Sequence, residues 1–196
     1  MRSASAAPSA PAPAPADLGP AEPARTGATR AWLCAAGAAL CLSVAAPGAV
    51  RGAEALVVVG LALLYRVVTG GRGSALRAYL VGVAYLAAVS WSLRHIVFAA
   101  YVAIALLGGV YFAILPRWVR GLGALRVPGP LAFGLAVAGA AWLRAYMPEI
   151  TYPHAQPAHA LFRWPALLYG PVALGGEELA NVLLAACAAA AAAGAW

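Results

Sequence analysis

Apolar runs of near membrane-helix length alternate with short polar gaps along most of the chain. After residue 30 the gaps carry arginine, glycine or proline, residues that flank or end helices. A helix needs about 20 apolar residues to cross a bilayer. The pattern therefore predicts an all-α membrane protein, a polytopic bundle of about six transmembrane helices, with runs over 31–48, 55–69, 75–93, 96–115, 128–146 and 179–196.

The first 29 residues lack this pattern. They are rich in Ala, Pro and Ser and include a Pro-Ala repeat at 11–16. Such a segment has too little apolar surface to bury, so we expect a disordered tail with polyproline character. The predicted organisation is a tail over 1–29 followed by a transmembrane helical domain over 30–196. Small residues such as Gly134 and Ala138 in the fifth run would let helices pack closely.

One long polar segment, 147–178, separates the fifth and sixth runs. Together with the helix ends beside it, it contains half of the six acidic residues, two of the three histidines and several prolines and aromatics. Because the apolar runs on both sides predict membrane scaffold, we expect candidate functional residues to concentrate here.

Composition agrees with a membrane location. The chain is 64% hydrophobic and 10% charged, with a mean hydropathy of +0.82, whereas soluble domains carry about 25% charged residues. All 13 basic residues are arginines. They lie in the gaps between apolar runs instead of forming one basic face, which argues against nucleic-acid binding.

The arginines also predict the orientation. With a cytoplasmic N-terminus, nine arginines would lie inside and four outside, as the positive-inside rule prefers. This places the 147–178 segment in the periplasm and the C-terminus in the cytoplasm.

Several stretches, taken in order, resemble the N-terminal membrane domain of bacterial apolipoprotein N-acyltransferase. Residues 77–82 (Arg-Ala-Tyr-Leu-Val-Gly) lead into Trp91, and Tyr101–Leu115 precedes Pro116-Arg117. They are followed by Trp142-Leu143-Arg144, an aromatic and proline-rich loop, and Gly175-Gly176-Glu177-Glu178 with Asn181. Phe162-Arg163-Trp164-Pro165 is similar to a shuffled form of the family's Phe-Pro-Trp element. The resemblance covers about 31–196; it departs at Ala141, where the family often has a glutamate, and in a loop that is more polar than usual.

The resemblance implies a role in lipoprotein biosynthesis at the inner membrane. The family transfers an acyl chain from a phospholipid to the α-amino group of a lipoprotein's diacylglyceryl cysteine. Catalysis belongs to a nitrilase-like domain with a Glu-Lys-Cys triad, in which the thiolate takes the acyl group and passes it to the amine. This chain has no lysine, and Cys34, Cys41 and Cys187 lie in apolar runs where a thiol is inert. We therefore expect a catalytically incomplete membrane domain with no catalytic residue of its own.

Arginines and aromatic residues of the loop region are the candidates for lipid contact. Arg144 and Arg163 could bind a phospholipid phosphate in a bidentate way, or be ordinary arginines at a helix end. Rings at headgroup depth could contact a lipid substrate or only anchor the protein; they belong to Tyr152, Phe162 and Trp164.

The remaining candidates are structural polar residues. Glu177 and Glu178 suit the start of the last helix, or one of them could pair with Arg144 or Arg163. Asn181, one turn into an apolar run, is expected to hydrogen-bond to a partner helix.

No metal or other cofactor is expected. His154, His159 and Glu149 lack the helical spacing of a strong metal motif. The expected partners are the phospholipid bilayer, a lipoprotein substrate or a separate nitrilase-like domain. The alternative is a small polytopic transporter-like protein or a stand-alone membrane scaffold; a transporter is disfavoured because no run has a carboxylate at its middle. An intramembrane protease is weaker still, since Ser90 and His95 lack a nucleophile-elbow motif.

Overall fold

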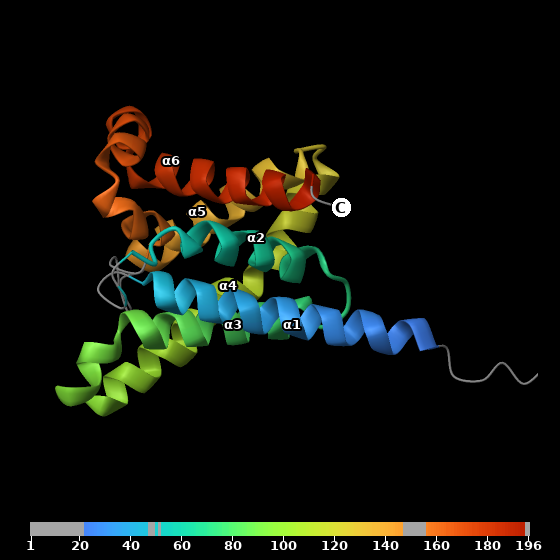
Figure 1. Cartoon of the computed structure of the whole chain (residues 1–196), viewed down its shortest axis with the longest axis horizontal. Coiled ribbons are helices and arrows are strands. Elements are labelled where there is room, and N and C mark those ends of the chain that lie inside the picture. The colour runs from blue at the N-terminus through green and yellow to red at the C-terminus, as the bar shows by residue number, and fades with distance from the viewer. Residues whose placement is uncertain (1–21, 47–49, 51, 147–155, 195–196) are drawn as a thin grey trace, which may run out of the picture.

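The computed structural model describes residues 22–46, 50, 52–146 and 156–194. Within these ranges the chain forms helices and no strand (Figure 1). The elements are α1 (Glu22–Ala45), α2 (Leu56–Thr69), α3 (Ser74–Val89), the 3-10 helix η1 (Trp91–His95), α4 (Phe98–Ala124), α5 (Gly129–Tyr146), the 3-10 helix η2 (Pro157–Arg163) and α6 (Pro165–Gly194).

Consecutive helices run side by side in alternating directions (Figure 1). The most extensive packing joins α3 with α4, α5 with α6 and α1 with α2. One end of the bundle, which we call the arginine-rich end, holds the start of α1, the turns 70–73 and 125–128, and the end of α6. The opposite end, the cap end, holds the end of α1, the start of α2, η1 and η2.

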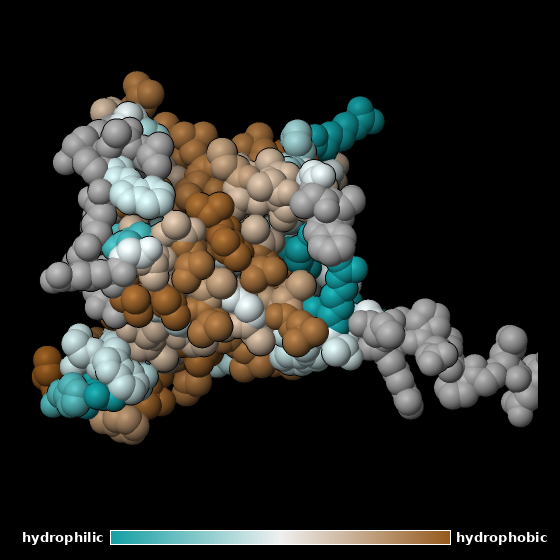
Figure 2. Space-filling view, viewed as in Figure 1, coloured by the Kyte–Doolittle hydropathy of each residue, from teal (hydrophilic) through white to brown (hydrophobic). Residues whose placement is uncertain are grey.

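Three segments are long and apolar enough to cross a membrane: Gly27–Ala45, Phe98–Ala124 and Gly170–Gly194. Apolar residues also cover the middle of the face shown in Figure 2, and polar residues lie toward its two ends. All described elements are helices, and these three segments agree with the predicted helical membrane protein. The count of six spans is not confirmed, because α2 and α3 have 14 and 16 residues, or about 21 and 24 Å at 1.5 Å per residue, against a hydrocarbon core of about 30 Å.

Three helix boundaries differ from those predicted. Helix α1 begins at Glu22, inside the predicted tail, whose residues 1–21 lie outside the described part. Helix α4 continues through the buried Pro116, where a stop was predicted. In an apolar environment the proline removes one backbone hydrogen bond, whereas ending the helix there would expose several unpaired groups. Helix α6 begins at Pro165, before the predicted start at 179, but its backbone breaks at Gly175 and Gly176, and the part after the break begins at Glu177, close to that prediction.

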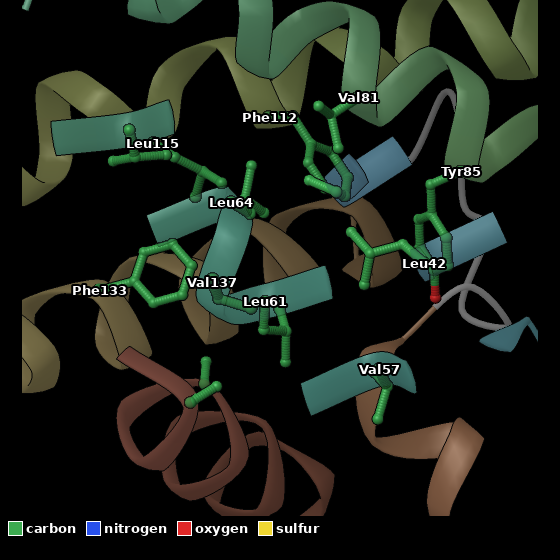
Figure 3. Packing of buried hydrophobic residues seen from close by; sticks show 14 of the residues in the cluster. Leu42, Val57, Leu61, Leu64, Val81, Tyr85, Phe112, Leu115, Phe133 and Val137 are labelled. Atoms are coloured by element: carbon green, nitrogen blue, oxygen red, sulfur yellow. The ribbon is translucent and has the colours of Figure 1, made fainter. Parts of the chain in front are cut away.

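The core is built from aliphatic side chains and rings contributed by α1 to α6 and by η2. Figure 3 shows Leu42, Leu61 and Leu64 beside Phe112 and Phe133. Small residues bring backbones together, as predicted: at Gly134 on α5, an added Cβ would lie 2.5 Å from the Val182 carbonyl oxygen of α6. The α5–α6 pair, which carries the candidate site, is therefore held in direct backbone contact.

Candidate functional site at the cap end

A break in α6 shapes the site. Gly175 and Gly176 have non-helical backbone angles, and Gly176 has a φ of 70°, a left-handed conformation that glycine adopts without steric cost. The break divides α6 into an arm, 165–174, and a shaft, 177–194. We call residues 156–176 the cap. Glu177 and Glu178 begin the shaft, where carboxylates interact favourably with the free N–H groups and the dipole of a helix start.

Asn181 fastens the cap to the shaft. Its side chain is fully buried. The side-chain oxygen accepts a hydrogen bond from the Ala158 backbone N–H at 3.0 Å, and the side-chain nitrogen donates to Gln156 Oε1 at 2.5 Å and to the Glu177 carbonyl at 3.0 Å. The partners thus come from η2, from the residue before it and from α6 itself, and not from another membrane helix as expected.

A second contact lies one turn away. Nε2 of His159 is 3.1 Å from Oε2 of Glu177. The histidine side chain is 10% exposed and the glutamate side chain 42%, so this pair forms the rim of the cap and the Asn181 hydrogen bonds lie beneath it. The predicted pairing of Glu177 or Glu178 with Arg144 or Arg163 stays a prediction.

An open cleft of about 470 Å³ lies between the shaft, the cap and the end of α5. Its lining consists of Ala145, Tyr146, Gln156, Glu177 and Glu178. Two carboxylates and one carboxamide therefore face this space, and the described lining residues include no basic side chain. Such a surface attracts a cationic group, because a cleft lined by one sign of charge concentrates the opposite sign.

Arg144 lies inside the bundle. Its side chain is 4% exposed and lines a cavity of about 20 Å³, whose other lining residues include Tyr85 and Pro157; about 10–15 Å³ suffices for one water molecule. Arg144 shares the inward face of α5 with the buried Ala140 and Ala141, one turn earlier. A lipid headgroup at the surface therefore does not reach this guanidinium unless the cap opens.

The chain matches no family model, no curated protein and no solved structure.

The other candidate residues from the sequence differ in exposure and in whether they lie in the described part of the chain. Trp164, at the junction of η2 and α6, is 41% exposed. Phe162 and Arg163 end η2, while Tyr152, His154 and Glu149 lie outside the described residues. Gln156 was missed, because a glutamine in a proline-rich segment carries no signal. Within the described part of the chain, no cluster of three or more His, Cys, Asp or Glu side chains could hold a metal ion.

Proposed function

We propose that this protein is a membrane domain of the apolipoprotein N-acyltransferase kind, which receives the lipoprotein's diacylglyceryl cysteine at its cap end. Acyl transfer would depend on a nitrilase-like domain. The proposal rests on the ordered sequence motifs and, above all, on one observation: the 470 Å³ cleft between cap and shaft is lined by Glu177 and Glu178. The α-amino group of the lipopeptide is a cation near neutral pH, and this cleft has the complementary charge.

The surroundings of the cleft fit a lipid-linked ligand. Tyr146 is 64% exposed at one side, and Trp164 and Leu174 of the cap are 41% and 85% exposed. Amphipathic rings of this kind lie at headgroup depth in membranes. A diacylglyceryl chain could therefore stay in the bilayer beside the cap while the amine enters the cleft.

The arginine distribution supports the orientation that this role requires. Among the described residues, the arginine-rich end carries Arg25, Arg30, Arg66, Arg72, Arg77, Arg117, Arg120 and Arg126, and the cap end carries Arg94, Arg144 and Arg163. The positive-inside rule favours the richer end in the cytoplasm. We propose an inner-membrane location with the cap end facing the periplasm.

The chemistry of the described chain supports only the binding half of the reaction. Cys34 and Cys41 are half-buried in α1, and Cys187 faces outward from the shaft of α6. None of them lines the cleft. We therefore assign this chain positioning of the lipopeptide amine and none of the bond-making steps.

Photolabelling tests the proposal. The chain is reconstituted in liposomes with a diacylglyceryl lipopeptide that has a free α-amine and a photoreactive acyl chain. We expect adducts on the cap and on the end of α5, competed by unlabelled free-amine lipopeptide at least fivefold better than by its N-acetylated form. Glu177→Gln with Glu178→Gln should abolish that preference, while Glu54→Gln, at the same end of the bundle, should keep it. Adducts spread evenly over all apolar helices, or equal competition by both lipopeptides, would contradict the proposal.

A further inference from the structure

A second cavity lies at the arginine-rich end, between α1 and α2. It is open, has a volume of about 370 Å³ and is lined by Gly27, Arg30, Ala31, Cys34, Leu63 and Arg66. Ligand pockets commonly have about 300–1,000 Å³. The α1 residues follow helical spacing and so form one stripe that faces the groove. We call this cavity the α1–α2 groove.

The groove combines two guanidinium groups with an apolar wall. Arg30 and Arg66 both line it, and none of its described lining residues is acidic. Guanidinium also presents several N–H donors that match phosphate oxygens in a bidentate way.

Arg66 is held in place from outside the groove. Its Nη2 donates a hydrogen bond to the Ala192 carbonyl near the end of α6. This contact satisfies one of the carbonyls that a helix end leaves unpaired and fixes the guanidinium plane. Each arginine side chain has five N–H donors, so one guanidinium can contact more than one group.

The outer surface beside the groove is apolar. On α1, Leu33 is 67% exposed, and on α2, Val59 is 47% exposed. Cys34 and Leu63 add apolar lining to the groove itself. A ligand with a phosphate at the arginines and hydrocarbon chains along α1 and α2 would match both parts of this surface.

We propose that the α1–α2 groove binds an anionic phospholipid, with the phosphate between Arg30 and Arg66 and the acyl chains along the outer faces of α1 and α2. Basic pockets between membrane helices bind anionic headgroups in this way. The site is at the opposite end of the bundle from the cap and is independent of the proposed function.

Native mass spectrometry of the full chain in a neutral detergent tests this proposal, with diphosphatidylglycerol, phosphatidylglycerol and phosphatidylcholine as probes. We expect the two anionic lipids to bind at least tenfold more tightly than phosphatidylcholine. Arg30→Gln should weaken their binding about fivefold, and Arg30→Gln with Arg66→Gln about 25-fold, from the typical contribution of each basic residue at an anionic headgroup.

Matched controls separate a site from diffuse charge. Arg72→Gln and Arg120→Gln remove the same charge from exposed positions at the same end and should change binding less than twofold. Because Arg66→Gln also removes the contact to α6, Ala31→Phe provides a variant that narrows the groove without altering charge, and it should weaken binding at least fivefold. The proposal would be overturned by an equal loss of binding in the control variants or by equal binding of phosphatidylcholine. It would also be overturned if Ala31→Phe left binding unaltered, or if millimolar inorganic phosphate displaced the lipid.

Discussion

Replacing Asn181 by leucine should release the cap while the helical bundle stays folded. Leucine has a similar volume and keeps the apolar packing, but it offers no acceptor to the buried Ala158 N–H and no donor to Gln156. An unsatisfied buried donor costs about 1–3 kcal/mol. Gln156 is itself only 4% exposed, so the loss of the donor to its side-chain oxygen adds to this cost.

The expected change is therefore about 1–3 kcal/mol in the free energy of cap opening, or about 5-fold to 150-fold in the opening equilibrium. Amide hydrogen exchange in nanodiscs measures it directly. Peptides covering 158–164 should exchange faster by that factor, while peptides from the middle of α5 should keep their protection. Cys187→Ala, an exposed change on the same helix, is the control and should alter neither.

A double variant sharpens this test. When both partners of a hydrogen bond are replaced by apolar groups, the cost is smaller than when one is left unsatisfied. Asn181→Leu combined with Gln156→Leu should therefore accelerate exchange by less than the product of the two single effects. If exchange over 158–164 stays within twofold of the wild-type rate in Asn181→Leu, Asn181 does not hold the cap and the reasoning fails.

Three further changes test other contacts. Gly134→Ala places a Cβ 2.5 Å from the Val182 carbonyl oxygen and should lower the thermal unfolding midpoint in detergent by several degrees. The control Gly121→Ala, which has open space around it, should not lower the midpoint. Equal midpoints of the two variants would refute the close α5–α6 contact. Arg77 donates to the Gly70 and Arg72 carbonyls at 2.8 and 2.9 Å. Arg77→Lys, which lacks the planar fork, should speed proteolysis at 70–73, and an unchanged rate would show that the turn does not depend on these bonds. Glu177→Gln should raise cap exchange less than about threefold, because a pair with a 42% exposed carboxylate contributes little; a larger rise would make the rim pair a main fastening.

The sequence predicted the helices best where their ends carry residues that cannot continue a helix. Helix α2 was expected over 55–69 and spans Leu56–Thr69, and α5 was expected over 128–146 and spans Gly129–Tyr146. Both are bounded by glycine, proline or arginine. The continuation of α4 through Pro116 could not be predicted from the residue alone, because it depends on what surrounds the proline: a proline in water ends a helix more readily than one buried among apolar neighbours.

The site was predictable only in part, for the same kind of reason. Asn181 stood out because an amide within an apolar run must find a partner, and the structure shows it fully buried with three hydrogen bonds. Its partner Gln156 did not stand out, since only the folding of the cap back onto α6 brings the two together. Arg144 was expected at the surface and is buried, because the face of α5 on which it lies became clear only from the packing.

Cysteine accessibility in intact cells tests the central claim most directly, namely that the cap end faces the periplasm and the arginine-rich end the cytoplasm. In a chain with Cys34→Ala, Cys41→Ala and Cys187→Ala, single cysteines are introduced as Trp164→Cys in the cap or Leu125→Cys in the α4–α5 turn, both at exposed positions. A membrane-impermeant maleimide should label the Trp164→Cys chain in spheroplasts and the Leu125→Cys chain only after permeabilisation. The reverse pattern, or labelling of both from outside, would contradict the account.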